Sequence, residues 1–356
     1  MANDVKRQLP DIPYVSAGAI STLDLPRDSV LKSLGLAWLL SQTTGTTPAS
    51  GAEPTSGILA AIRRLEIVAD GALTLWSIDP WSLYTLNALW NGAYYNREDL
   101  APPAMSTSSV LAAYMDIPFA LPKAKDPNVT LLNAQALSSL QLRVTWGAIT
   151  DLFVTVANTS INTTSVLSAE THEIVGLSPR SIFSAFKVGQ ITRDISAAST
   201  QLQIDLPRGN VLRGLLFKTR TVTAPVEVNV DTILSEVRLE SSELNRGLFV
   251  HRRTRGTDTD GTGRPLTGHH IRQRARAWSG LSDHWAPATG LQAQPAGGTY
   301  LTGFYPLDFM EDGRTSSALR TQAYSSLAAI CNVAAPATSP QVTITTQEII
   351  PAAPPR

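Results

Sequence analysis

The phrase LDLPRDSVLK at residues 23–32 returns almost unchanged as IDLPRGNVLR at residues 204–213. In both, an apolar–Asp–Leu–Pro–Arg run is followed by Val, Leu and a basic residue, and the two phrases align from end to end without a gap. Proline removes a donor from a sheet ladder and favours a turn, so each phrase predicts a strand, a corner and a second strand. The residues predicted at the two corners are Leu25, Pro26 and Arg27, and Leu206, Pro207 and Arg208.

Three further pairs of segments recur in the same order along the chain. They are 62–67 with 234–239, 117–119 with 307–309, and QALSSL at 135–140 with QAYSSL at 322–327. The separation between the two members differs somewhat from pair to pair. Surface loops accept insertions at small entropic cost, so this drift is typical of a duplicated unit whose loops have changed length. We therefore expect one structural unit to occur twice.

Apolar and polar residues alternate over many short runs. Leu140, Leu142 and Val144 share one face of such a run, and the stretches 226–239 and 341–349 alternate in the same way. Period-two runs rich in β-branched residues are typical of strands, and 23 Gly and 23 Pro supply turn residues between them. The pattern predicts an all-β protein built of β-sandwiches.

Two segments depart from this alternation. In PWSLYTLNALWNGAYYN at 80–96, apolar residues recur at helical spacing from Leu83 to Leu89, and Pro80 suits the first turn of a helix. SSVLAAYM at 108–115 is predicted as a second short helix. The alternative for both is a loop packed against the sandwich, and in either case they are insertions between strands.

Composition limits the classes of function. The 356 residues are enough for two domains, and 43% hydrophobic residues can supply a core to each. A formal net charge of zero gives no overall attraction to nucleic acid or to an anionic membrane. Charged residues make up only 16%, which favours a surface buried in an assembly. We find neither a secretory signal nor a long apolar run, so we expect a chain that folds in the cytosol without a transmembrane helix.

The most polar stretch is RRTRGTDTDGTGRPLTGHHIRQRAR at 252–276. One hypothesis gives it phosphate contacts, with a genome or with lipid headgroups. The favoured alternative is a solvated loop or a contact with a neighbouring subunit, since no aromatic residues interleave with the arginines as single-strand binding would need. DTDG at 258–261 begins like a calcium loop but lacks the closing glutamate, which favours a hydrated turn. The candidate partner or lipid contacts are Arg252, Arg253, Arg255, Arg272, Arg274 and Arg276.

Side chains suited to catalysis or metal binding are sparse. A two-repeat metal enzyme of the cupin type needs a His-x-His pair in each half, but the first half has only His172. In the second half, the adjacent His269 and His270 would point to opposite faces of a strand. Cys331 is the single cysteine, which excludes an intrachain disulfide, and its apolar neighbours predict a buried thiol. We predict no enzyme, no cofactor, and no catalytic, cofactor-binding or metal-binding residue.

With these repeated corners and strands, the chain resembles the double jelly-roll major capsid (coat) proteins of tailless icosahedral viruses of bacteria, archaea and eukaryotes, many of which have an internal membrane. The resemblance is carried by residues 23–32, by RRLEIVADGALTLWSIDPWSLYTLN at 63–87 and by residues 204–213, and it extends over most of the chain. It implies two tandem eight-stranded jelly rolls with short helical insertions. Residues 1–185 would form the N-terminal roll and residues 186–356 the C-terminal roll.

The resemblance also implies a structural role in a virion. Three subunits would set six rolls around a three-fold axis, giving a pseudo-hexagonal trimeric capsomer that tiles an icosahedral shell. The implied partners are the chain itself as a homotrimer, other capsid proteins and an internal viral membrane, with no sequence-specific nucleic acid. Synthesis in the host cytoplasm would precede assembly into the capsid. The terminal segments 1–8 and 351–356 are expected to be arms that order against a neighbour or a membrane.

Two other classes of function stay open from the sequence. A carbohydrate- or receptor-binding β-sandwich, such as a spike or lectin, would use exposed aromatic residues, for which Trp278 and Trp285 are candidates. The tryptophans are not repeated between the halves, which disfavours a pair of sugar sites. A bicupin-type enzyme is the least favoured of the three, because the histidines do not fit it.

Overall fold

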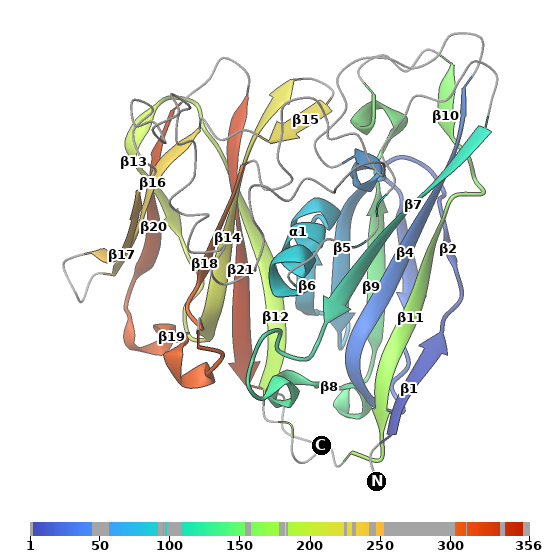
Figure 1. The fold of residues 1–356 in the computed structure, drawn as a ribbon, viewed down its shortest axis with the longest axis horizontal. Coiled ribbons are helices and arrows are strands. Elements are labelled where there is room, and N and C mark those ends of the chain that lie inside the picture. The colour runs from blue at the N-terminus through green and yellow to red at the C-terminus, as the bar shows by residue number, and fades with distance from the viewer. Residues whose placement is uncertain are drawn as a thin grey trace, which may run out of the picture.

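Most of the described chain lies in β-strands that run along the long direction of the rolls (Figure 1). The all-β prediction is confirmed. The computed structural model describes residues 3–44, 57–91, 95, 97, 108–153, 158–177, 182, 184–223, 226–229, 233–241, 247–252, 303–310, 312–334 and 339–351.

The N-terminal roll consists of two facing antiparallel sheets. The first, called here the N-outer sheet, has the order β1 (Asn3–Gln8), β11 (Val166–Val175), β4 (Val30–Thr44) and β7 (Ser108–Pro118). The second, the N-inner sheet, has the order β3 (Ile20–Asp24), β9 (Leu140–Trp146), β5 (Ile62–Ala69) and β6 (Leu73–Ile78). The chain passes back and forth between the two sheets, which is the connectivity of a jelly roll.

The C-terminal roll repeats this order strand for strand. Its C-inner sheet runs β12 (Ser184–Asp194), β21 (Pro340–Pro351), β14 (Val211–Thr223) and β18 (Phe304–Asp308). Its C-outer sheet runs β13 (Ser199–Asp205), β20 (Leu327–Val333), β16 (Leu234–Ser241) and β17 (Gly247–Arg252). The predicted pair of tandem eight-stranded jelly rolls is therefore the observed fold. The boundary between residues 185 and 186 falls just inside β12 and stays a prediction.

Shorter elements complete the two rolls. The minor strands are β2 (Ile12–Pro13), β8 (Leu132–Asn133), β10 (Thr159–Ile161), β15 (Val226–Asn229) and β19 (Leu319–Arg320). The short 3-10 helices are η1 (Gly57–Ala61), η2 (Pro127–Thr130), η3 (Ala134–Ala136), η4 (Ile149–Asp151), η6 (Thr315–Ser317) and η7 (Thr321–Ala323). Within the described ranges, no helix is both long and apolar enough to cross a membrane.

The repeated segments 117–119 and 307–309 occupy equivalent positions in the strand pairing of the two rolls. In the N-terminal roll Ile117 lies opposite Leu34, and in the C-terminal roll Leu307 lies opposite Leu215. Leu34 and Leu215 keep the separation of the corner phrases, whereas Ile117 and Leu307 lie further apart in the sequence. The change in separation thus falls in the connections between strands, as expected for a duplicated unit.

Alternation decides which side chains enter the two cores. Along β9, Leu140, Leu142, Val144 and Trp146 are buried, while the residues between them are half-buried. The C-terminal core is built in the same way and contains Cys331, whose thiol pKa is raised to about 12 by burial. The predicted burial of this cysteine is confirmed.

The helix α1 (Pro80–Asn91) packs between the two rolls. Asp79 caps it by accepting a hydrogen bond from the Ser82 backbone N–H at 3.0 Å, and Pro80 occupies the first turn, as predicted. Nearly all its side chains are buried, because β5 and β7 of one roll and β14 of the other surround it. The helix therefore belongs to the join between the rolls.

Two predictions about local structure were wrong. The segment 108–115 is part of strand β7 instead of a helix, because β7 pairs with β4 over its whole length and, from Ala113 on, its buried side chains alternate with exposed or half-buried ones. Residues 3–8 are not a free arm, because they form β1 and pair with β11 from Asn3 to Gln8. In both cases pairing with a neighbouring strand outweighs the local preference of the segment. Residues 1–2 and 352–356 lie outside the described residues.

Candidate functional site

The two LPR corners make equivalent contacts in the two rolls. Arg27 Nη1 donates to the carbonyl oxygens of Leu137 at 3.0 Å and Ser138 at 2.6 Å. Arg208 Nη1 donates to the carbonyl oxygen of Tyr324 at 3.3 Å, and Tyr324 occupies the same place in QAYSSL that Leu137 has in QALSSL. Each corner arginine therefore binds the other repeated phrase of its roll. Leu25 and Leu206 are buried beside them, and Pro26 and Pro207 are half-buried.

Each roll also contains a buried glutamate that the sequence reasoning missed. Glu173 in β11 and Glu348 in β21 are 1% and 2% exposed. Ser29 Oγ donates to Glu173 at 2.7 Å, and Asn210 Nδ2 donates to Glu348 at 2.5 Å. Ser29 and Asn210 are equivalent positions, directly after the two corners. A buried carboxylate needs such donors to offset its desolvation, and the corner supplies one in each roll.

A threonine and a β-bulge complete the arrangement around each glutamate. Thr171 Oγ1 lies 2.6 Å from Glu173 Oε1, and Thr346 Oγ1 lies 3.2 Å from Glu348 Oε1. The pairing with β4 or β14 shifts by one residue at the same place in both rolls, next to each glutamate. The sequence signal for this site is a fifth repeat, THEI at 171–174 and TQEI at 346–349.

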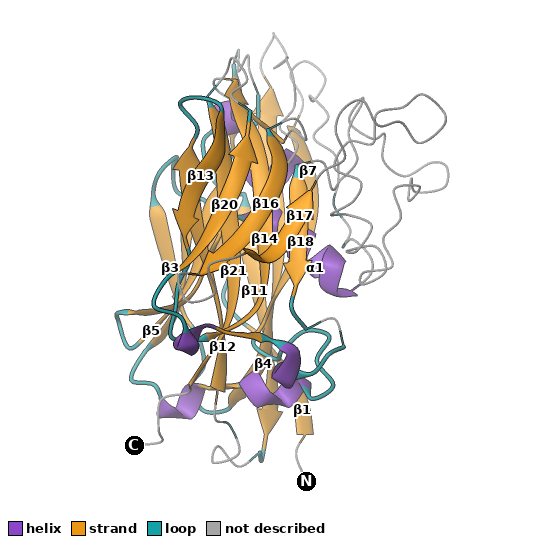
Figure 2. Ribbon diagram, turned by 90° about the vertical axis from the view of Figure 1, so that its left-hand side faces the viewer, coloured by secondary structure: helices purple, strands orange, loops and turns teal. Residues whose placement is uncertain are grey.

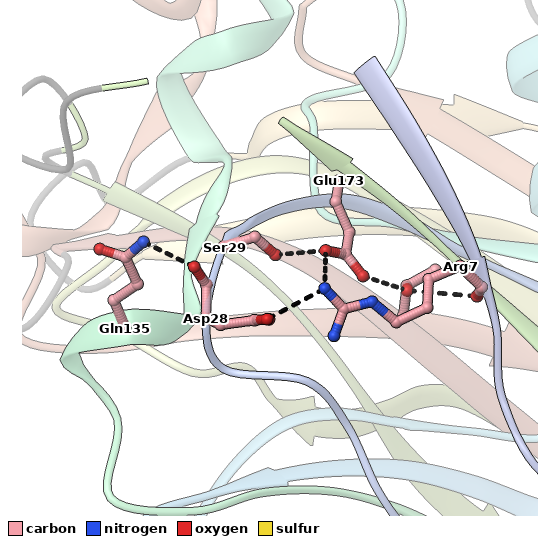
Figure 3. A network of polar contacts seen from close by, with 6 residues as sticks. Arg7, Asp28, Ser29, Gln135 and Glu173 are labelled. Atoms are coloured by element: carbon pink, nitrogen blue, oxygen red, sulfur yellow. Dashed lines mark hydrogen bonds and ion pairs between the residues drawn. The ribbon is translucent and has the colours of Figure 1, made fainter. Parts of the chain in front are cut away.

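In the N-terminal roll an arginine joins this network (Figure 3). Arg7 Nη2 lies 3.1 Å from Glu173 Oε2 and 3.0 Å from Asp28 Oδ2, and Gln135 Nε2 donates to the Asp28 carbonyl oxygen at 2.9 Å. The hydrogen bond with Asp28 raises the pKa of Arg7 and lowers the pKa of Asp28. Strand β1 is thereby tied to the first corner.

The inner sheets of the two rolls join into one continuous sheet. Trp76 of β6 pairs in parallel with Val188 of β12. Across the same join, Lys218 Nζ lies 2.8 Å from Asp79 Oδ2, and the Arg213 guanidinium stacks 5.8 Å from the Trp90 ring. The N-inner and C-inner sheets thus join at their edges, and the two outer sheets lie at opposite sides of the molecule (Figure 1).

The N-outer face carries an exposed apolar strip on β7 and β4. Val110 and Tyr114 are 65% and 43% exposed. Ala112 and Tyr114 lie opposite Leu39 and Ala37 in the register, and these partners are half-buried. Large aromatic and aliphatic side chains gathered on one face are typical of a protein contact surface.

The C-outer sheet (Figure 2) carries polar side chains next to the apolar Ile330. Ile330 is 8% exposed and lies between Gln203 and Arg238 in the register. Arg238 lies 3.4 Å from Glu236 and 3.4 Å from Glu240, which forms a charged row along β16. The charged ends of these side chains can form hydrogen bonds with an opposing protein surface, and the aliphatic part of Arg238 can pack against it.

Most of the predicted arginine segment lies outside the described residues. Arg252 is the last residue of β17, opposite Glu236. Outside the described residues are Arg253, Arg255, Arg272, Arg274 and Arg276, together with 258–261, His269, His270, Trp278 and Trp285. His172 lies 2.9 Å from Glu170. Among the described residues no cluster of three metal-ligating side chains occurs.

The paired rolls place the chain in the double jelly-roll class of folds. No protein-family model matches the sequence, and no curated protein matches it. The major capsid protein (MCP) of STIV, the Sulfolobus turreted icosahedral virus, is similar in structure, with a TM-score of 0.68 at 13% identity, over 98% of this chain and 97% of that one.

Two other solved structures show the same fold. The major capsid protein of bacteriophage PM2 gives a TM-score of 0.57 at 14% identity, over 99% of this chain and 98% of that one. The Faustovirus major capsid protein gives 0.58 at 9% identity, over 99% and 91%. These similarities cover both rolls and the join between them.

Proposed function

We propose that this chain is the major capsid protein of an icosahedral virus and acts as a structural protein of the virion. The support is the double jelly-roll fold, which it shares over nearly its full length with major capsid proteins. The low content of charged residues, 16%, agrees with a surface that is largely covered after assembly. We propose no catalytic role.

The finer proposal is a homotrimer built from the two outer faces. Within one chain, the N-inner and C-inner sheets join at their edges, and the N-outer and C-outer sheets lie at opposite sides of the molecule (Figure 1). If the N-outer face of one subunit packs on the C-outer face of the next, the contact is heterologous, and it closes into a ring when the rotation is one third of a turn. Six rolls of similar shape then give a pseudo-hexagonal capsomer, with residues 1–185 and 186–356 as its repeating halves.

One observation carries this proposal: Val110 and Tyr114 are exposed on β7 of the N-outer sheet. Light scattering on the purified protein tests it. Three chains of 38.2 kDa give 114.6 kDa, and electron micrographs should show pseudo-hexagonal outlines. If the protein stays monomeric at every concentration, and assembled shells show no three-fold clusters of subunits, the contact between outer faces is absent and the trimer proposal is wrong.

Substitution sharpens that test. Tyr114→Glu places a charge in the centre of the strip and should shift the protein to monomers, because an unpaired charge in an interface costs several kcal/mol (about 2–5). Leu73→Glu is the matched control, since Leu73 is equally exposed, at 43%, but lies at the turn between β5 and β6. Equal trimer content in both variants would show that the strip is not the contact.

For the remaining partners we propose other capsid proteins and an internal membrane, after synthesis in the host cytoplasm. The segment 252–276 is our candidate for contact with a neighbouring subunit or with lipid headgroups, on the basis of its arginines alone. Co-flotation of the trimer with vesicles containing anionic lipid tests the second role. Replacing Arg272, Arg274 and Arg276 by glutamine should abolish flotation if lipid is the partner, and unchanged flotation would exclude them.

A further inference from the structure

The join between the two rolls brings two sheet edges together and covers one sheet face. At the edges, β6 and β12 run in parallel, and Trp76 lies beside Val188. On the face, α1 of the N-terminal roll packs on the C-inner sheet, where the rings of Trp81 and Phe304 meet edge-on at 6.0 Å between centroids. Phe304 is 0% exposed. The N-terminal roll therefore shields a face of its duplicate.

The N-outer sheet is the duplicate of the C-inner sheet, but in the described part of the chain its face lacks such a cover. Tyr114 lies opposite Ala37 of β4, and Phe304 lies opposite Lys218 of β14. Because Ala37 and Lys218 keep the separation of the two corner phrases, Tyr114 and Phe304 are equivalent. Tyr114 is nevertheless 43% exposed. The position that α1 covers in one roll is thus open in the other.

Strand β17, at the edge of the C-outer sheet, is the duplicate of β6. Trp76 lies opposite Ile67, and Phe249 lies opposite Leu239. Ile67 and Leu239 are the last residues of one of the repeated pairs of segments, and the register shifts directly after each of them. Phe249 is therefore the counterpart of Trp76.

Strand β1, at the edge of the N-outer sheet, is the duplicate of β12. Arg7 and Gly189 lie opposite equivalent threonines of β11 and β21, so the preceding residues, Lys6 and Val188, are counterparts. Among the described strands, β1 pairs only with β11 and β17 pairs only with β16. The two strands lie at opposite sides of the molecule (Figure 1). Each chain therefore has two open edges that match the two edges joined inside it.

We propose that the contact between subunits repeats the join within the chain: β17 of one subunit pairs in parallel with β1 of the next, with Phe249 beside Lys6. The proposal rests on the trimer proposed above and places the β17 edge of the C-outer sheet at its contact. Because the two edges lie on different sides of the chain, the contact is heterologous, and three copies close a ring in which every roll has the same two kinds of neighbour. The N-outer face with Tyr114 then lies against the C-terminal roll of the neighbour.

The charges along β1 are compatible with such a contact. Lys6 Nζ lies 3.3 Å from Glu170 Oε1, and Lys32 Nζ lies 3.0 Å from Asp4 Oδ2. Since both pairs are formed within one subunit, covering them does not bury an isolated charge. Pairing also gives the backbone N–H and C=O groups of both open edges hydrogen-bond partners. A polar edge suits subunits that fold separately and then meet, because the rims of protein interfaces are polar.

Disulfide cross-linking of the full-length protein tests the proposal. Lys6→Cys with Phe249→Cys puts one thiol on each edge, and strands about 4.8 Å apart bring the Cα atoms into the range of about 4.4–6.8 Å that a disulfide needs. Mild oxidation should give covalent trimers on a denaturing gel without reductant. Gln8→Cys with His251→Cys is a second pair in the same register. Cys331 is buried and the pKa of its thiol is raised, so the wild-type chain gives the background.

The matched control moves the β1 cysteine to Thr22, which is exposed on β3 at the edge of the N-inner sheet of the same roll. This control should not cross-link, and circular dichroism shows which variants fold. If light scattering gives the mass of a trimer but neither test pair cross-links more than its control, the edge contact is overturned and the trimer stands. A protein that is monomeric by the same measurement overturns both proposals.

Discussion

The two rolls share a strand plan but hold their buried glutamates differently. Arg7 of β1 lies opposite Thr171 and reaches Glu173, whereas Gly189 of β12 occupies the matching position opposite Thr346. Strand β1 pairs only with β11 among the described strands, and the side chain of Arg7 is 42% exposed. Strand β12 instead lies between β21 and β6. At the sheet edge, β1 has one neighbouring strand, and the long side chain of Arg7 adds a further contact. Strand β12 has a neighbouring strand on each side, and a glycine occupies the matching position.

Duplication kept the hydrogen bonds at the two corners, whereas the join between the rolls acquired contacts of its own. The acceptors Glu173 and Glu348 and their donors Ser29 and Asn210 are equivalent in the two rolls. The join added contacts between the two rolls, such as the packing of α1 against β14 and the Asp79–Lys218 pair.

The largest effect is expected at the join. Asp79→Ala removes the cap of α1 and leaves Lys218 buried without its partner, which costs about 3–5 kcal/mol for a broken buried pair. Scanning calorimetry should show a large drop in melting temperature and separate transitions for the two rolls. Asp205→Ala, on the exposed face of β13, is the control. A single transition at an unchanged temperature would contradict the role of the pair.

A pH effect is expected from Asp116 of the N-terminal roll. Burial raises the pKa of Asp116 in β7 to about 6, against the lowering effect of the hydrogen bond with Ser33 and the charge of His172. A raised carboxyl pKa means that ionisation destabilises the fold, so the stability from this group increases as pH falls from about 6 toward 4. The matching position of the C-terminal roll is Pro306, one residue before Leu307 as Asp116 is one before Ile117, and proline cannot titrate.

Asp116→Asn should remove that dependence and raise stability at pH 7 by on the order of 2 kcal/mol, since one pKa unit corresponds to about 1.4 kcal/mol. Urea unfolding at several pH values between 4 and 8 measures it. A variant whose pH profile matches that of the wild type would show that Asp116 is not desolvated as described.

The buried glutamates should have similar effects in the two rolls. Glu173→Ala and Glu348→Ala each leave buried donors without an acceptor, at a cost of about 1–3 kcal/mol. Chemical denaturation of both variants measures the difference in unfolding free energy. If only one of the two destabilises the protein, the equivalence of the two sites is wrong.

The smallest effect is expected for Arg7→Ala. Its own side chain is 42% exposed and its partner Asp28 is exposed, while its buried partner Glu173 keeps Ser29 and Thr171 as donors. Solvent therefore screens the interaction, and the loss should be about 1 kcal/mol or less. The effect should shrink further in high salt. A loss as large as that of Glu173→Ala would show that β1 contributes more to the fold than its edge position suggests.

Several features could be predicted because they depend on local chemistry. The alternation along β9, the proline that starts α1 and the apolar surroundings of Cys331 predicted their structures correctly. The segment 108–115 was predicted wrongly, since its residues have helical preference and only the presence of β4 beside it makes it a strand. The glutamates were missed, because a charged residue in a strand gives no sign that it is buried until its donors are in place.

The sequence by itself determined that one β-rich unit occurs twice, since the repeated corners and the strand alternation are encoded in neighbouring residues. Only the tertiary structure decided which faces meet and which sheet remains uncovered. These properties depend on contacts between residues far apart in the chain, such as Asp79 with Lys218 and Ser29 with Glu173. Their free energy arises only when folding brings the partners together and removes the water between them.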